Sequence, residues 1–146
     1  MKNDTLFVSY AHADDLYLNR LTNQLKAAAF RHIDCWDDRR IQTGEQWHKE
    51  IQSRLKKARG GILMVSASFL SSQYIGSHEI PVLLQNYHRR GTLIFPIIVR
   101  PCPWEEHPWL KELNIHKPLT PLSSLRVDRQ EQKLCDFVRE IKRKLS

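Results

Sequence analysis

The stretch from Gly60 to Val65 reads GGILMV, and it decides the fold class of this chain. Glycine is common just beyond the last turn of a helix, because it readily adopts the left-handed backbone needed there. The four residues from Ile62 to Val65 carry no polar side chain, which is typical of a central strand in a parallel sheet covered on both faces. We therefore predict that a helix ends at Gly60-Gly61 and that a buried parallel strand follows at once.

Strand-like and helix-like segments alternate on both sides of this strand. Short runs of β-branched, aromatic and aliphatic residues predict strands at Thr5–Tyr10, His32–Trp36, Thr92–Val99 and, briefly, near Lys117–Leu119. Apolar residues that recur every three or four positions predict helices at about Asp14–Phe30, across Trp47–Ala58, after Ser77 to about Arg90, and at about Asp128–Leu145.

Two segments between these elements predict irregular structure. Ser66–Ser77 is rich in serine, and Arg100–His116 contains three prolines, so we expect loops or irregular turns in both. Pro96 predicts a bulge or an interrupted ladder in its strand, because proline has no N–H to donate. Pro81 is tolerated only near a helix start or at a kink, which places Glu79 in or just before the first turn of an exposed helix start.

The alternation of strands and helices predicts a single α/β domain over residues 1–146. The expected fold is a flavodoxin-like, doubly wound parallel sheet of about five strands, in the order 2-1-3-4-5, with helices on both faces. Ligands of such folds bind beyond the carboxyl ends of the strands, where the strand order reverses. Here that edge is formed by Ser9–Asp14, Trp36–Gly44 and Ser66–Glu79, where the polar residues of the chain gather.

The composition is that of an ordinary globular domain. Hydrophobic residues make up 41% and charged residues 27% of the 146 positions, so a core can form and disorder is not expected. No apolar run approaches the roughly 20 residues of a membrane span, and the N-terminus has no signal-peptide pattern. Three cysteines in unrelated contexts fit reduced thiols. We therefore expect a cytoplasmic protein without a membrane contact.

The net charge of +7 leaves two kinds of anionic partner open. Nucleic acid is one. We disfavour it, because much of the excess lies in Arg39-Arg40 and Lys142–Lys144 and no aromatic residues interleave with the second run, as a stacking surface would need. A basic surface would attract an anionic small molecule, such as a dinucleotide, equally well. The histidines and cysteines show no metal-ligand spacing, so we predict no metal site and no cofactor.

Several motifs of related folds are missing from the sequence. There is no P-loop, no glycine fingerprint of a dinucleotide-binding strand–helix unit, and no Gly-x-Ser-x-Gly elbow. A phosphoacceptor receiver domain would need acidic residues after the first strand and a lysine after the fourth. The chain has Ser9-Tyr10-Ala11 and Arg100 at these places.

Four short motifs fall at the predicted ligand edge. They read FVSYAHxD over residues 7–14, WDDRxIxxGxxW over residues 36–47, VSxSFLxSxY over residues 65–74 and EIP over residues 79–81. In this order and spacing they resemble the Toll/interleukin-1 receptor (TIR) domain family, in particular its bacterial, NAD-cleaving branch. The resemblance covers essentially the whole chain, and it implies the same flavodoxin-like fold.

The resemblance also implies roles for individual residues. Glu79 matches the catalytic glutamate at the start of the family's third helix, and Tyr74 matches the aromatic residue before it. The loop from Asp37 to Gly44 corresponds to a family loop that borders the site and contacts neighbouring protomers. The implied substrate-binding residues are Ser9, Tyr10, Trp36, Asp38, Arg39, Ser66 and Tyr74. The implied assembly residues are Asp37, Arg40, Ile41 and Gly44.

Structural roles stay open beside these functional ones. Trp36 also fits a core aromatic residue at the end of a strand. Asp37 and Asp38 also fit residues that cap and turn a loop, and Ser9 and Ser66 fit local backbone caps.

One glutamate is chemically sufficient for cleavage of the nicotinamide–ribose bond. Ordinary glycosidases need two carboxylates, one of which protonates the leaving oxygen. Nicotinamide leaves NAD as a neutral base from a cationic ring, so no general acid is required. A single carboxylate near the ribose can stabilise the positive charge that develops in the transition state.

The resemblance therefore implies an NAD glycohydrolase or cyclase, an NAD+ nucleosidase of bacterial immune defence. Its products would be nicotinamide and ADP-ribose, or a cyclic ADP-ribose. Its partners would be NAD, other TIR domains stacked head to tail, and a fused or bound sensor domain. The alternative is a non-catalytic TIR module that signals by self-association. A third class, enzymes like nucleoside deoxyribosyltransferases, also pairs this fold with a glutamate, and we disfavour it because the Trp-Asp-Asp-Arg loop of this chain points to the TIR family.

Overall fold

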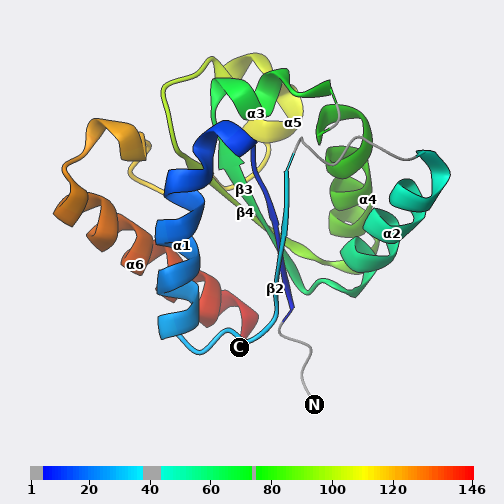
Figure 1. Ribbon diagram of the computed structural model, residues 1–146, viewed down its shortest axis with the longest axis horizontal. Helices are drawn as coiled ribbons and strands as arrows, with labels where there is room; N and C mark the ends of the chain where they lie inside the picture. The colour runs from blue at the N-terminus through cyan, green and yellow to red at the C-terminus, as the bar shows by residue number, and fades with distance from the viewer. Residues whose placement is uncertain (1–4, 38–43, 74) are drawn as a thin grey trace.

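A computed structural model describes residues 5–37, 44–73 and 75–146, and its centre is a parallel sheet (Figure 1). The strands are β1 (Leu6–Ser9), β2 (Ile33–Trp36), β3 (Gly60–Val65) and β4 (Leu93–Ile98). They pair in parallel in the order β2-β1-β3-β4. The strand order reverses between β1 and β3, which confirms the predicted doubly wound, flavodoxin-like class.

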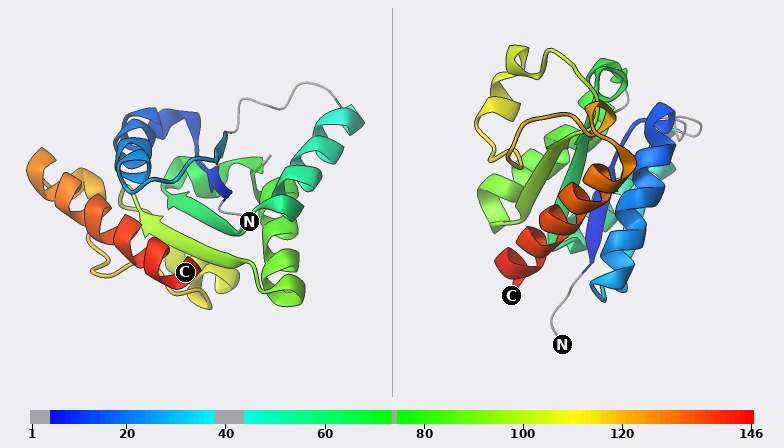
Figure 2. Two further views of the ribbon diagram at one scale, coloured as in Figure 1. Left: turned by 90° about the horizontal axis from the view of Figure 1, so that it is seen from below. Right: turned by 90° about the vertical axis from the view of Figure 1, so that its left-hand side faces the viewer.

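Two pairs of helices cover the two faces of the sheet (Figures 1 and 2). Helices α1 (Asp15–Ala27) and α6 (Val127–Leu145) lie on one face, and α2 (Gly44–Lys57) and α4 (Ile80–Arg90) lie on the other. Successive residues of a strand point to opposite faces, so β1 contributes to two separate apolar clusters. Leu6 and Val8 belong to the cluster beneath α1 and α6, and Phe7 belongs to the cluster beneath α2 and α4.

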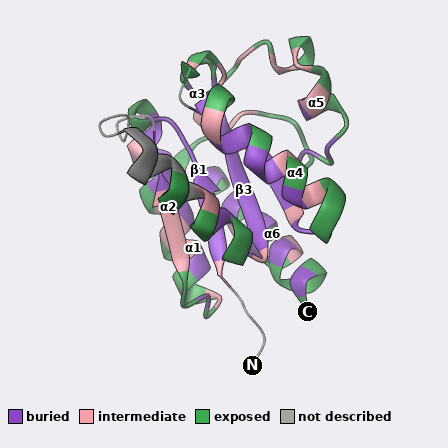
Figure 3. Cartoon of the chain, turned by 90° about the vertical axis from the view of Figure 1, so that its right-hand side faces the viewer, coloured by how far each residue is buried: buried purple, intermediate pink, exposed green. Residues whose placement is uncertain are grey.

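Short helical segments complete the carboxyl edge of the sheet. They are a 3-10 turn at His12–Asp14, helix α3 (Ala67–Ser71), a π-helical turn at Ile75–Glu79, a 3-10 turn at Trp104–Glu106, helix α5 (Pro108–Lys111) and a 3-10 turn at Leu122–Ser124. Figure 3 shows the buried strands at the centre and the exposed outer faces of α2 and α4. None of the described helices is both long and apolar enough to cross a membrane.

The segment Ser66–Ser77 contains helical turns where we expected a loop or irregular turn, because serines cap these helical turns. The Ser66 hydroxyl accepts a hydrogen bond from Phe69 N at 3.1 Å and so starts α3. The Ser72 hydroxyl accepts one from Ile75 N at 3.2 Å, at the start of the π-helical turn. Serine is frequent in loops for the same reason that it is favoured at helix starts. Composition alone therefore did not separate the two structures.

The glycine pair has a different role from the predicted one. Helix α2 ends at Lys57, and Gly60 and Gly61 are the first residues of β3. A Cβ atom on Gly61 would lie 2.8 Å from Cδ2 of Leu83 in α4. The glycine therefore allows α4 to approach the sheet closely. Gly91 does end α4 in the left-handed conformation, with φ of 70°.

The interruption expected at Pro96 is absent, because β4 is an edge strand in the described part of the chain. The register is continuous, with Leu63 paired to Pro96. The Pro96 carbonyl accepts a hydrogen bond from His116 N at 2.9 Å, on the side away from β3. The N and O atoms of one strand residue point to the same side, so the missing N–H of Pro96 costs no ladder bond.

The fifth strand expected near Lys117–Leu119 does not form. This segment follows His116, whose hydrogen bond to Pro96 is an isolated one. The Lys133 ammonium donates to the carbonyl oxygens of Pro118 and Thr120 instead. Since Pro118 has no N–H, the segment is a poor partner for a further strand ladder.

Candidate functional site

The structure gathers the described candidate residues at the carboxyl edge of the sheet and buries them. Six of these residues are at most 5% exposed: Ser9, Tyr10, Trp36, Asp37, Ser66 and Glu79. Gly44 is the first residue of α2. Five further candidates lie outside the described residues: Asp38, Arg39, Arg40, Ile41 and Tyr74.

Glu79 lies where the sequence predicted it, but it is not at an exposed helix start. It is the last residue of the π-helical turn and directly precedes α4, which carries Pro81 in its first turn. The residue is 0% exposed. Its neighbours Ile75 and Ile80 belong to the apolar cluster beneath α2 and α4. π-helical turns are rare and often occur at functional sites.

A cavity borders the turn that carries Glu79. Its volume is about 240 Å³. It is lined by Phe69, Leu70, Ile75, Gly76, Ile80, His107 and Trp109. The sequence did not predict the contribution of His107 and Trp109, which come from the segment after β4. Sites for whole cofactors usually measure roughly 300–1,000 Å³, so a dinucleotide would need further surfaces beside this cavity.

Ser9 presents a buried hydroxyl on the face of the sheet that α4 covers. It is the last residue of β1 and points to the same side as Phe7. Its Oγ atom has no hydrogen-bond partner within the described ranges, and the residue is 0% exposed. The Ser9 hydroxyl therefore does not cap the local backbone, which was one of its two predicted roles. The hydroxyl can accept or donate a bond to a bound molecule.

A buried network joins the ends of three strands, and the sequence did not identify it. The Ser66 hydroxyl donates to Oδ2 of Asp14 at 2.5 Å, and Arg100 donates through Nε to Oδ1 at 2.9 Å. Asp14 is 0% exposed and Arg100 is 47% exposed. The guanidinium group also lies 5.3 Å from the ring centre of Tyr17. Because Ser66 also caps α3, its hydroxyl both donates and accepts inside the protein.

Tyr10 and Asp37 form a second buried contact at this edge. The Tyr10 hydroxyl donates to Oδ2 of Asp37 at 3.1 Å. Burial, and next the negative charge of Asp37, raise the pKa of Tyr10 well above its ordinary value. Asp37 is only 3% exposed, so its carboxylate lies inside the protein and not on an exposed surface of the assembly loop.

We expect Tyr10→Phe to lower the free energy of unfolding at neutral pH. We also expect the variant to lose less stability than the wild type as the pH rises above about 10. Removing the donor to a buried carboxylate costs about 1–3 kcal/mol. The raised pKa of Tyr10 means that the folded state holds this proton more tightly than the unfolded state. Stability from this group is complete below the unfolded pKa of about 10 and falls as the pH rises above it. Thermal unfolding at about pH 8 and about pH 11 tests this, and equal losses in both proteins would contradict it.

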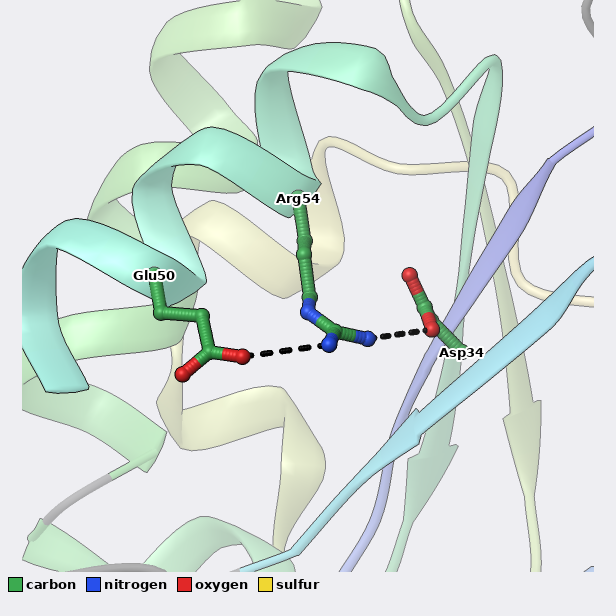
Figure 4. Close-up of polar contacts among 3 residues, drawn as sticks. All are labelled: Asp34, Glu50 and Arg54. Atoms are coloured by element: carbon green, nitrogen blue, oxygen red, sulfur yellow. Dashed lines mark hydrogen bonds and ion pairs between the residues drawn. The ribbon is translucent and has the colours of Figure 1, made fainter.

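Trp36 is buried in the core, as one of its two predicted roles requires. It is 1% exposed, and its ring stacks on Phe7 with a centroid separation of 6.3 Å. The Arg54 guanidinium lies 5.3 Å from the Trp36 ring centre. Arg54 is held by Asp34 at 2.8 Å and by Glu50 at 3.1 Å (Figure 4). A substrate contact by Trp36 stays a prediction.

Three possible metal ligands also meet here, which sequence spacing did not reveal. One ligand atom each of His12, Asp15 and Asp37 lies within 4.8 Å of the other two. His12 Nδ1 and Asp15 Oδ2 are 2.7 Å apart. An imidazole and two carboxylates suit several divalent ions. We predicted no metal site because the sequence shows no ligand cluster, but the structure brings three possible ligands together.

Comparisons with known proteins agree with the fold. A family model described as "TIR domain" matches residues 6–135. The "Uncharacterized protein y4lF" of Sinorhizobium fredii (strain NBRC 101917 / NGR234) is 33% identical over 108 residues, or 73% of this chain. The match spans 33% of that relative's length, so the chain corresponds to about a third of it. A solved structure, "Crystal structure of the RPS4 and RRS1 TIR domain heterodimer", is similar with a TM-score of 0.67 and 13% identity, over 96% of both chains.

Proposed function

The chain belongs to the TIR domain family, and on this premise we propose that it cleaves NAD at the nicotinamide–ribose bond, with Glu79 as the catalytic carboxylate. The reaction class is that of an NAD+ nucleosidase of the bacterial NAD-cleaving branch. NAD is the substrate, and the reaction needs no further cofactor.

The complete burial of Glu79 at the start of α4 is the observation that carries this proposal. A carboxylate buried away from water interacts more strongly with a developing positive charge than one in water. The ribose becomes oxocarbenium-like as neutral nicotinamide departs, so the negative charge of Glu79 favours the transition state over the ground state. The buried hydroxyl of Ser9 can orient a ribose hydroxyl on the same face of the sheet.

The remaining substrate contacts are proposed from the family resemblance. They are Tyr10, Trp36, Asp38, Arg39, Ser66 and Tyr74. Tyr10 and Ser66 also hold the carboxylates of Asp37 and Asp14 at the edge of the site. Water capture of the ribose cation gives ADP-ribose, and capture by an atom of the same molecule gives a cyclic ADP-ribose. Exclusion of water from the site favours the cyclic product.

Product analysis tests the proposal. The purified domain is incubated with NAD, and the mixture is separated by liquid chromatography at several times. We expect free nicotinamide together with an equal amount of ADP-ribose or a cyclic isomer. A domain that leaves NAD intact but self-associates would support the alternative, an interaction module without catalysis.

We expect cleavage to be independent of metal ions, although His12, Asp15 and Asp37 could hold one. Neutral nicotinamide needs no Lewis acid to leave. Nicotinamide release is therefore expected to be unchanged in EDTA and in Asp15→Asn, which removes one ligand charge. Loss of activity in EDTA, with recovery in one particular divalent ion, would contradict this expectation.

We also propose that the site is completed by a neighbouring protomer. The cavity that borders the π-helical turn is smaller than a dinucleotide requires. The similar solved structure is a heterodimer of TIR domains. Head-to-tail contacts do not close, so they produce filaments rather than a single dimer. A cytoplasmic sensor domain, fused or bound, would raise the effective concentration of the TIR domains in an immune response.

Specific activity should then rise with protein concentration. We expect nicotinamide release per protomer to fall steeply when the domain is diluted about a hundredfold, because a second-order contact is lost. Reversal of Arg39 and Arg40 to glutamate should lower activity at every concentration. Reversal of Arg126 and Arg129, two exposed residues of the last helix region, is the matched control. Constant activity per protomer from a sample that light scattering shows to be monomeric would refute the assembly argument.

A further inference from the structure

Helices α2 and α4 lie side by side on one face of the sheet (Figures 1 and 3). Nδ2 of Asn86 in α4 donates to the carbonyl oxygen of Leu55 in α2 at 3.0 Å, and Asn86 is 5% exposed. This bond fixes the two helices to each other near their carboxyl ends. Arg89 lies ten residues after Glu79, or about 15 Å along a helix, so the cationic end of this region lies away from Glu79.

A groove of about 270 Å³ runs between these two helices. Its lining residues are Gln52, Lys56, Val82, Gln85, Asn86, Arg89 and Arg90. Two arginines, one lysine and three residues with amide side chains therefore line the groove, and none of the lining residues is acidic. The lining residues come from one side of each helix. In α2 they are four positions apart, and in α4 they follow the helical spacing of three and four positions.

Among the described residues, the three cationic residues of the groove lack the carboxylate partners that a nearby arginine of α2 has. Arg54 on α2 is paired with two carboxylates, those of Asp34 and Glu50 (Figure 4). Within the described part of the chain, no carboxylate lies within ion-pair distance of Lys56, Arg89 or Arg90. Cations at a helix carboxyl end stabilise the helix dipole. That effect explains each residue alone, but not why cations of two helices converge on one groove.

We propose that this groove binds a compact anionic ligand that carries two linked phosphate groups. A guanidinium group offers a planar pair of N–H donors that matches two phosphate oxygens, and an ammonium group adds a point charge. Two arginines and one lysine provide enough positive charge for a diphosphate. The amide groups of Gln85 and Gln52 line the same groove, where they can supply further hydrogen bonds.

The shape of the groove favours a small ligand over a polymer or a membrane. The cationic groups lie around a recess between two helices. A duplex or a bilayer would need cations spread over a broad surface. The ligand class is therefore a diphosphate ester or pyrophosphate. The proposal does not depend on NAD cleavage.

Isothermal titration calorimetry with inorganic pyrophosphate tests the proposal at about 0.15 M salt, where weak surface attraction is screened. We expect saturable binding to one site, with orthophosphate at least about tenfold weaker. Changing Arg89 and Arg90 together to glutamine should weaken pyrophosphate binding by about tenfold or more, and Lys56→Gln should weaken it by less. Changing the exposed Arg126 and Arg129 to glutamine is the control and should have no effect.

Three results would overturn the proposal. One is the absence of pyrophosphate binding by the wild-type domain at millimolar concentration. Another is binding that the Arg89 and Arg90 changes leave intact, because the site would then lie elsewhere. The third is binding only to a single-stranded oligonucleotide or to vesicles containing a phosphoinositide, with none to pyrophosphate. Circular dichroism of each variant confirms that the exposed substitutions leave the fold intact.

Discussion

Replacement of Glu79 by glutamine is expected to lower the rate of nicotinamide release by about a hundredfold or more, in a domain that still folds. Glutamine has nearly the shape of glutamate, so the packing of the turn before α4 is kept while the negative charge is lost. That charge stabilises the transition state more than the bound substrate, so turnover falls and the Michaelis constant changes little. Steady-state rates at saturating NAD measure the effect.

Glu131→Gln is the matched control, because Glu131 is an exposed glutamate of α6. It should keep wild-type turnover. Circular dichroism and thermal unfolding establish that Glu79→Gln is folded. Turnover above about a tenth of the wild-type value would contradict the mechanism, which assigns more than one tenfold factor to this carboxylate.

Arg100→Ala is expected to lower the free energy of unfolding by about 2–4 kcal/mol. Asp14 is 0% exposed and forms its ion pair with Arg100, so the variant leaves a buried carboxylate without that cation. We place the effect toward the lower end for buried pairs, because Arg100 is 47% exposed and partly screened by water. For a domain of this size the unfolding midpoint should fall by about 5–15 °C. Arg139→Ala, an exposed change on α6, is the control.

A second substitution separates charge from packing in this network. Asp14→Asn in the Arg100→Ala protein removes the uncompensated charge and keeps an oxygen that can accept from Ser66. We therefore expect the double variant to regain part of the lost stability, in a double-mutant cycle followed by urea unfolding. If the double variant is less stable than Arg100→Ala alone, the ion pair is not the main contribution of Arg100.

Local patterns were sufficient to predict the fold and the position of Glu79. The alternation of apolar runs and helical periods gave the strand order, because right-handed crossovers leave few ways to connect parallel strands. Glu79 could be placed because Pro81 restricts where α4 begins. The edge that brings Ser9 and Ser66 together follows from the parallel sheet itself, since the carboxyl ends of its strands lie at one edge.

The tertiary partners of these residues could not be read from the sequence. Asp14 and Arg100 are 86 positions apart, and neither has a local pattern that marks it as half of a buried ion pair. The burial of Glu79 depends on a π-helical turn, which serine-rich composition does not distinguish from a loop. Glycine next to a helical pattern predicts a helix end at Gly61, whereas this residue admits Leu83 against the sheet. Pro96 predicts an interruption only if β4 is paired on both sides, and the edge position of β4 is a property of the whole sheet.

The most direct test of the account follows NAD by proton NMR spectroscopy in the presence of the concentrated wild-type domain, with light scattering on the same sample. We expect resonances of free nicotinamide to grow as those of NAD disappear, and the Glu79→Gln domain to leave the NAD spectrum unchanged. An unchanged NAD spectrum with wild-type domain that light scattering shows to be assembled would contradict catalysis by Glu79. It would identify the chain as an interaction module.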